Sequence, residues 1–261
     1  MPSTSKFLSR IRNCRFTMGY GLGLICILVA CALLLYAGDK PPDRIPSNVE
    51  WTPETISIAK SGDAFRGLLL AKHCDHCHGT EGFSATATIP DLAGLDKLSI
   101  WKQMEDFRSH KRYSAIMEPI AGTLSSKDVA DLAAYFAMLP VLSDPLDKRS
   151  FPQAQPKPHD AGVASRLITL GDGERGIPPC QACHGPASYR IASPSLTAQN
   201  ADYILNQLDA FASGMRTNDI DMPMRTIAMQ LTEDERQALA EYYGSGLGML
   251  PPGSTEPKAK P

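Results

Sequence analysis

The chain has 261 residues, with 26 basic side chains, 28 acidic side chains and a formal net charge of −2 at pH 7. This length predicts one or two domains. The absence of a basic excess argues against a nucleic-acid-binding protein, because that class depends on a positively charged face. Hydrophobic residues make up 43% of the sequence, which is ordinary for a folded protein.

The N-terminal segment, residues 1–38, has the pattern of a membrane anchor. Four basic residues precede an uncharged apolar run over residues 19–38; they are Lys6, Arg10, Arg12 and Arg15. At the rise of an α-helix, a run of this length matches a bilayer core of about 30 Å. The positive flank predicts a cytoplasmic N-terminus and places the rest of the chain on the outer side. We therefore expect an uncleaved transmembrane helix.

Two other interpretations of this segment stay open. The sequence before Cys31 resembles a lipobox, which would make Cys31 a lipidated residue, but the chain stays apolar after it. A cleaved signal peptide is the third interpretation, and the long run without a clear small-x-small site disfavours it. An anchor helix and a lipid would both tether the protein to the membrane.

The rest of the chain divides into two similar parts. Proline-rich composition predicts linkers over residues 39–56 and 143–160, since proline disfavours a helix interior. Domains are expected over residues 57–142 and 161–248. The polar, proline-rich tail, residues 249–261, has the composition of a disordered segment.

The pentapeptide Cys-x-x-Cys-His occurs twice, at residues 74–78 and 180–184. It is the attachment signature of a c-type haem. Two residues between the cysteines put both sulfurs on one side of a helical turn, at the spacing of the two porphyrin vinyl groups. We therefore expect two covalently bound haem c groups, with thioether links from four cysteines and iron ligation by two histidines: Cys74, Cys77, His78, Cys180, Cys183 and His184.

A zinc site or a redox-active cysteine pair is the alternative interpretation. Zinc needs four ligands, and His73 and His76 would complete only the first set. Neither alternative explains why histidine follows the second cysteine both times. The remaining cysteines all lie in the N-terminal segment, so none is left in the body of the chain for a structural disulfide.

Internal repetition indicates a tandem duplication. Residues 103–112 recur 104 positions later as residues 207–216, and residues 124–136 recur 107 positions later as residues 231–243. The segments 124–136 and 231–243 each open with a capping box, Ser125 to Asp128 and Thr232 to Glu235, which predicts the start of a helix. In the first copy, apolar residues then follow at i, i+3, i+4 and i+7, as in an amphipathic helix. Each repeat is therefore expected to be a small all-α domain.

Met117 and Met224 are the expected second axial ligands. Each lies seven residues before the leucine that opens a capped helix, Leu124 or Leu231. Met222 competes with Met224, but only Met224 keeps this spacing. Ligation by histidine and methionine closes the iron to substrates and raises its reduction potential relative to two histidines. This favours an electron carrier over an enzyme such as a dihaem peroxidase, which would need an open or displaceable site.

The pattern resembles the class I cytochromes c. In that fold a loop proline carbonyl accepts the N–H of the iron-ligating imidazole, which would assign this role to Pro90 and Pro194. Residues 176–185 and 216–225 further resemble the second haem motif and methionine loop of the dihaem cytochrome c4 family. The resemblance covers about residues 57–248. It implies an all-α fold of two tandem class I domains, packed face to face with haem propionates near the shared interface, here preceded by a transmembrane helix.

These expectations define a membrane-tethered dihaem electron carrier of the bacterial cytoplasmic membrane, with a cytoplasmic N-terminus, periplasmic haem domains and no catalytic residues. The family resemblance implies delivery of electrons to a terminal oxidase or another periplasmic acceptor, from a donor such as a quinol–cytochrome c reductase. A permanent electron-transfer subunit of a dehydrogenase or oxidase complex is the alternative.

After residue 38 the chain carries 22 basic and 28 acidic residues, a net charge of −6. Basic partners would attract such a body, whereas nucleic acid would not.

Overall fold

The structure, a computed structural model, describes residues 46–141, 158–185, 188 and 190–245. The predicted transmembrane helix, Cys31 and the polar tail lie outside these residues. Among the helices that are described, none combines the length and apolar character needed to cross a bilayer. The prediction of an anchor therefore stays a prediction.

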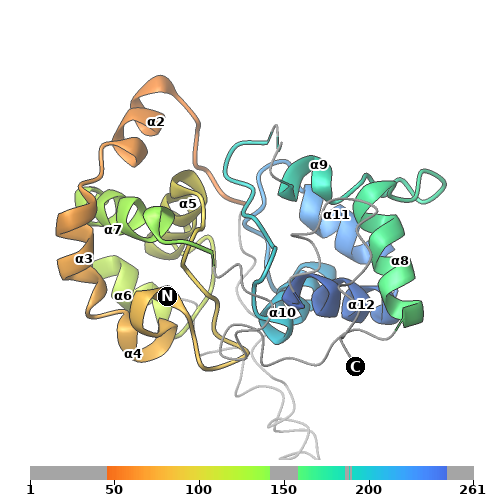
Figure 1. Cartoon of the computed structure of the whole chain (residues 1–261). Helices are drawn as coiled ribbons and strands as arrows, with labels where there is room; N and C mark the ends of the chain where they lie inside the picture. The colour runs from red at the N-terminus through yellow and green to blue at the C-terminus, as the bar shows by residue number, and fades with distance from the viewer. Residues whose placement is uncertain (1–45, 142–157, 186–187, 189, 246–261) are drawn as a thin grey trace, which may run out of the picture. The chain divides into compact units, whose positions relative to one another are not determined.

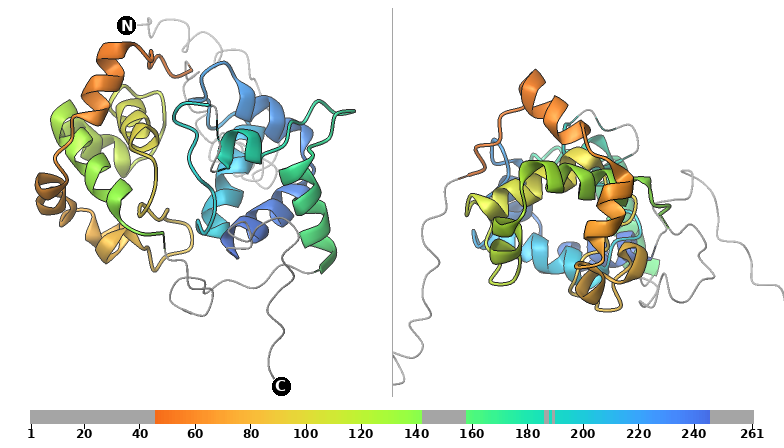
Figure 2. Two further views of the ribbon diagram at one scale, coloured as in Figure 1. Left: turned by 45° about the horizontal axis from the view of Figure 1, so that its top comes forward. Right: turned by 90° about the vertical axis from the view of Figure 1, so that its left-hand side faces the viewer.

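The described residues form helices, as the all-α prediction required (Figure 1). The first half contains α2 (Pro53–Lys60), α3 (Ala64–Ala71), α4 (Asp75–His78), the 3₁₀ turn η2 (Thr80–Gly82), α5 (Lys97–Arg108), α6 (Met117–Thr123) and α7 (Ser126–Met138). The second half contains α8 (Pro158–Thr169), α9 (Gln181–His184), α10 (Ala201–Ala212), α11 (Pro223–Gln230) and α12 (Glu233–Gly244). Figure 2 shows the two sets of helices as separate bundles.

Two helices begin inside segments that the sequence pattern assigned to linkers. α2 begins at Pro53 and α8 begins at Pro158. Proline is tolerated in the first turn of a helix because its missing N–H would have no helical partner there. The start of α2 is further stabilised by Thr52, whose side-chain oxygen accepts the Thr55 N–H at 3.2 Å. These prolines open helices and do not interrupt them.

Both predicted capping boxes are confirmed. The Ser125 hydroxyl accepts the Asp128 N–H at 3.1 Å, and the Asp128 carboxylate accepts the Ser125 N–H at 3.0 Å. Thr232 and Glu235 make the equivalent pair at 3.2 and 2.9 Å. The amphipathic stripe predicted for α7 is also confirmed, because its members are at most 4% exposed: Val129, Leu132, Ala133 and Phe136.

The crossing of α3 over α7 positions the first Cys-x-x-Cys-His motif, which follows α3 directly. A Cβ atom on Gly67 would lie 2.0 Å from the carbonyl oxygen of Asp131 in α7. The Asp131 carboxylate also accepts the Asp63 N–H, at 2.6 Å, just before α3 begins. The two helix backbones therefore meet at a distance that only glycine permits.

The second half has its own core, formed between α8, α10 and α12. Its most buried side chains include Leu167, Ile204 and Leu239, each at most 4% exposed. The described residues of both bundles group as one compact unit.

The Gly67→Ala substitution should destabilise the haem-loaded protein by about 3 kcal/mol, because the new methyl group would overlap the α7 backbone. The Gly162→Ala change in α8 is the matched control, since a Cβ there would meet nothing within 4 Å. We expect it to raise stability by about 0.5–1 kcal/mol, through the higher helix propensity of alanine. Denaturant unfolding monitored by circular dichroism measures both values. Equal stability of the two variants would contradict the close crossing.

Candidate haem sites

Each Cys-x-x-Cys-His motif forms a single helical turn. In the first, the backbone N–H groups of Cys77 and His78 donate to the Cys74 carbonyl at 3.2 and 2.9 Å. In the second, the same bonds join Cys183 and His184 to Cys180, again at 3.2 and 2.9 Å. A turn of this kind places both cysteines and the histidine beside one another, as the spacing predicted.

The first turn ends at a glycine that no other residue would replace without strain. Gly79 has a φ of +74°, and a Cβ there would lie 1.7 Å from the Phe83 carbonyl oxygen. The chain can therefore turn sharply after His78 and lead into the loop that contains Pro90.

Both motif histidines donate a hydrogen bond to a proline carbonyl. The distance from Nδ1 to the carbonyl oxygen is 2.8 Å for His78 and Pro90, and 2.8 Å for His184 and Pro194. The contacts predicted for Pro90 and Pro194 are thus confirmed. Since a carbonyl oxygen only accepts, each Nδ1 carries the proton and leaves the Nε2 lone pair available to a metal. Burial lowers the pKa of both imidazoles, which favours this neutral form at pH 7.

The candidate methionines lie at the starts of equivalent helices. Met117 opens α6 and is half-buried. Met224 is the second residue of α11, is half-buried and packs against the core of the second half. Met222 is 47% exposed, with a φ of +63°. The structure thus distinguishes the two candidates of the second half by burial.

An ion pair that the sequence reasoning did not identify holds the second methionine loop. The Asp219 carboxylate accepts the backbone N–H of Arg225 at 3.0 Å and its side-chain Nε–H at 2.6 Å. Both residues are at most 12% exposed in their side chains. Asp219 and Arg225 lie six residues apart, on either side of Met222 and Met224. This spacing is the sequence signal that could have indicated the ion pair.

Apolar side chains that are only partly buried surround the motif cysteines. In the second half, Cys180 and Met224 border the same core, together with Leu196, Leu205, Ile227 and Tyr242. In the first half, Cys74 borders a core with Leu70, Leu92, Leu95, Met104, Leu124 and Leu139. Burial raises the pKa of both Cys74 and Cys180 to about 11, so both are neutral thiols at pH 7 before haem is attached. A flat, largely apolar porphyrin fits these surroundings.

Two sites of this kind in one helical chain define the class of dihaem c-type cytochromes. A family model described as "Cytochrome C oxidase, cbb3-type, subunit III" matches residues 67–136. The chain is 39% identical over 178 residues to the "Thiosulfate dehydrogenase electron acceptor" of Stutzerimonas stutzeri, covering 67% of this chain and 79% of that protein. It is 37% identical over 186 residues to cytochrome c4 of Pseudomonas aeruginosa, covering 70% and 88%.

A solved structure shares the fold. The crystal structure of reduced recombinant cytochrome c4 from Pseudomonas stutzeri has a TM-score of 0.62 at 30% identity, covering 70% of this chain and 98% of that one. The chain belongs to the cytochrome c4 family. It carries two covalently bound haem c groups, and its function is electron transfer.

The repeated segment that revealed the duplication also joins the two halves. Arg112 donates to Gln103 of its own half at 2.8 Å and to Gln207 of the other half at 2.9 Å. Arg216 donates to Gln207 of its own half at 2.8 Å and to Gln103 of the other half at 3.1 Å. The four side chains form a nearly twofold-symmetric cluster. Burial and the neighbouring Arg112 lower the pKa of Arg216 to about 9.

One side of this interface carries a buried polar cluster without a symmetric counterpart. Lys102 and Asp106, at most 6% exposed, form an ion pair of 2.5 Å within α5. Lys102 also donates to the Asn218 carbonyl at 2.7 Å, and the Asn218 amide donates to Asp106 at 2.7 Å. The equivalent positions of α10 hold Asn206 and Ala210. The repeated segment preserves the glutamine and arginine of the symmetric contacts, but it does not preserve Lys102 and Asp106.

Asp91, the residue after Pro90, lies at the interface of the two halves. Its carboxylate accepts the Ser84 N–H at 2.7 Å and a bond from the Asn200 amide at 3.3 Å. Burial raises its pKa to about 6, from an ordinary value of 3.8. A negative charge beside the first motif therefore depends on pH in the mildly acidic range.

The stability of the protein should depend on pH through Asp91. Between about pH 4 and pH 6 the folded chain keeps a proton that the unfolded chain has released, so the folded state loses relative stability as the pH rises through this window. Asp91→Asn removes the titration. The free energy of unfolding of the natural chain, minus that of the variant, should therefore fall from pH 4 to pH 6 and level off above it. Denaturant unfolding of both haem-loaded proteins across this range measures the difference. A difference independent of pH would contradict the raised pKa.

Proposed function

We propose that this chain is a membrane-tethered dihaem electron carrier, in which Cys74, Cys77 and His78 hold one haem and Cys180, Cys183 and His184 hold the other. Met117 and Met224 are the second axial ligands in this proposal. Haem iron supplies one-electron chemistry, so the protein itself has to hold the groups, exclude water and set their potentials.

The observation that carries this proposal is the repeated hydrogen bond from a histidine Nδ1–H to a proline carbonyl, at 2.8 Å in both halves. It leaves Nε2 free and fixes the plane of the imidazole ring, as ligating histidines require. A half-buried methionine at the start of α6 and of α11 would supply the thioether ligand in each half. Such ligation leaves no open position for a substrate, which supports a carrier.

Charge at the interface of the halves supports the placement of the haem carboxylates that the family resemblance implies. Arg112 and Arg216 lie in one half-buried cluster, and their amide partners Gln103 and Gln207 bring no negative charge. Haem propionates near this cluster would add to the negative charge of Asp106 and Asp219, which already acts on Arg216. Each propionate would then be held by residues of both halves.

The tether and the location follow from the N-terminal segment. Residues 1–38 would span the cytoplasmic membrane, and the remaining chain would lie in the periplasm, where a donor such as a quinol–cytochrome c reductase and an acceptor such as a terminal oxidase exchange electrons. A net charge of −6 after residue 38 suits basic docking sites on such partners.

A second role is electron transfer for a periplasmic dehydrogenase. It is favoured by the 39% identity to a protein named as the electron acceptor of thiosulfate dehydrogenase. The same two haem sites would serve both roles. Rapid reduction of the purified protein by such a dehydrogenase with its substrate, compared with reduction by a quinol–cytochrome c reductase, distinguishes them. Purification from mildly solubilised membranes shows whether the chain travels alone or in a complex.

Met224→Ala should remove the sulfur-to-iron charge-transfer band of one haem and lower that haem's potential, because the thioether stabilises ferrous iron. Met222→Ala is the matched control, two residues away and 47% exposed, and should leave the band and both potentials unchanged. Optical spectra and a spectroelectrochemical titration measure these properties. Loss of the band in Met222→Ala instead would reverse the assignment.

Met117→Ala should produce the same loss in the other haem only. Cyanide should bind rapidly to one iron in each single variant and to neither iron in the natural protein, because six ligands close both sites. Rapid cyanide binding by the natural protein would favour a dihaem peroxidase over a carrier.

The natural chain, matured with haem in a competent host, should sediment with the cytoplasmic membrane. Replacing residues 1–38 by a cleavable signal peptide should release a haem-loaded protein into the soluble periplasmic fraction. Haem staining of the fractions measures the distribution. Recovery of the natural chain in the soluble fraction would reject both the anchor helix and the lipid at Cys31.

A further inference from the structure

Asn200 lies at the N-cap of α10 but makes no side-chain capping bond to that helix. Its counterpart in the first half, Asp96, caps α5 in the usual way, accepting the N–H groups of Leu98 and Ser99, both at 3.0 Å. The Asn200 amide instead donates to the Ile89 carbonyl at 2.7 Å and to the Asp91 carboxylate at 3.3 Å. A good capping residue is thus used to bind a loop of the other half.

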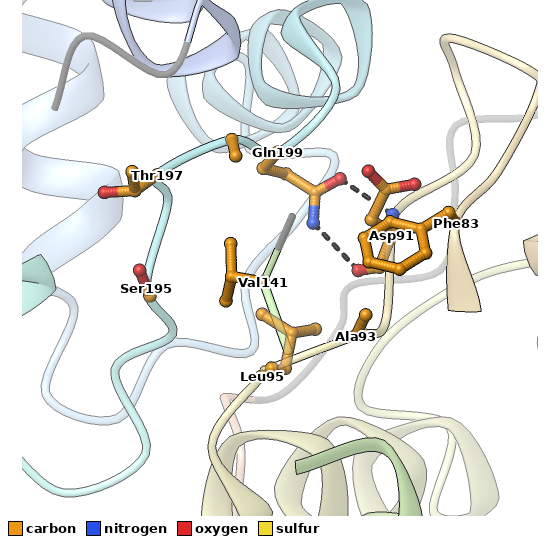
Figure 3. A pocket seen from close by; sticks show the side chains of 10 residues that line it. Phe83, Asp91, Ala93, Leu95, Val141, Ser195, Thr197 and Gln199 are labelled. Carbon is orange, nitrogen blue, oxygen red and sulfur yellow. Dashed lines mark hydrogen bonds between the residues drawn. The ribbon is translucent and has the colours of Figure 1, made fainter. Parts of the chain in front are cut away.

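The preceding residue, Gln199, binds the same loop at two points. Its Oε1 atom accepts the Asp91 N–H at 2.8 Å, and its Nε2 atom donates to the Asp91 carbonyl at 2.9 Å (Figure 3). Gln199 is 6% exposed, so water does not compete freely for these bonds. Asp91 and Gln199 line a pocket between the halves, and Figure 3 shows Ser195 and Thr197 on its second-half side.

The Asp91 N–H and the Pro90 carbonyl belong to one planar peptide unit. His78 donates to the carbonyl end of this unit, and Gln199 accepts from its N–H end. A continuous chain of hydrogen bonds therefore runs from Gln199 in the second half to the imidazole of His78 in the first. Bonds in such a chain polarise one another, so acceptance by Gln199 makes the Pro90 carbonyl a stronger acceptor.

The second half lacks the equivalent support. The position that matches Gln199 is Leu95, which has no polar atom in its side chain, and the peptide unit that matches is Pro194–Ser195. Within the part of the chain that the structure describes, no hydrogen bond joins Ser195 to the first half. The support is therefore one-way, although the domains are duplicated.

We propose that Gln199 is a positioning residue for the first haem: acting from the second half through the Pro90–Asp91 peptide, it strengthens the hydrogen bond of His78 and lowers the reduction potential of that haem. The inference rests on the proposed assignment of His78 as an iron ligand. A stronger acceptor at Nδ1–H makes the imidazole a better donor to iron, which stabilises the ferric state. The potential of the first haem then depends on contact with the second half.

The test is Gln199→Leu in the full-length, haem-loaded protein, a change that installs the residue type found at the equivalent position. Thr197→Val is the matched control, because it removes a hydroxyl group from the same loop and pocket wall without touching Asp91. Spectroelectrochemical titration gives both potentials, and Met117→Ala identifies the signal of the first haem. NMR of ¹⁵N-histidine-labelled ferrous protein reports the Nδ1–H proton of each ligating histidine.

Gln199→Leu should raise the potential of the first haem and shift the Nδ1–H signal of His78 upfield, while the second haem and His184 stay unchanged. Thr197→Val should change none of these. Equal shifts at both haems would mean a general loosening of the interface and would overturn the inference, as would unchanged signals at both. A natural protein with only one ligated histidine would instead reject the proposed ligand set itself.

Discussion

The hydrogen bond between an imidazole Nδ1–H and a proline carbonyl is the constraint on which both sites depend. It decides which nitrogen carries the proton, holds the ring plane and leaves Nε2 available to a metal. The bond forms only because a turn after the motif, enforced at Gly79 in the first half, returns the chain toward the histidine. The packing of α3 against α7 at Gly67 fixes the position of the first motif, because Cys74 follows soon after the end of α3.

Duplication explains the symmetric part of the contact between the halves. In each repeat the arginine donates to the glutamine of its own half and to the glutamine of the other half, so the same pair of hydrogen bonds occurs twice. The remaining contacts depart from this symmetry. Lys102, Asp106 and Asn218 form a buried cluster on one side. Gln199 and Asn200 bind the loop of the first half that contains Pro90 and Asp91. Two domains of common origin thereby acquire different surroundings.

This asymmetry has a consequence for a two-haem carrier. A difference in potential between the two sites decides on which haem a single electron mainly resides, and identical domains would give identical sites. Under the proposal above, contacts that reach His78 but not His184 would make the two potentials differ without changing any iron ligand. Asp91 adds a charge near the first site that depends on pH, because burial raises its pKa to about 6.

The sequence by itself determined the chemistry and the helical fold. The spacing of cysteines and histidine, the capping boxes at Ser125 and Thr232, and the prolines after each motif are local patterns, and local geometry is enough to interpret them. Helices α2 and α8 begin before the predicted ends of the two linkers, because proline in a helix's first turn looks like proline in a loop. Only the tertiary structure decided that Met224 is half-buried while Met222 is 47% exposed, and that Gln199 lies beside Asp91. These facts join residues far apart in the chain or depend on which way a helix faces its core, and no local spacing encodes them.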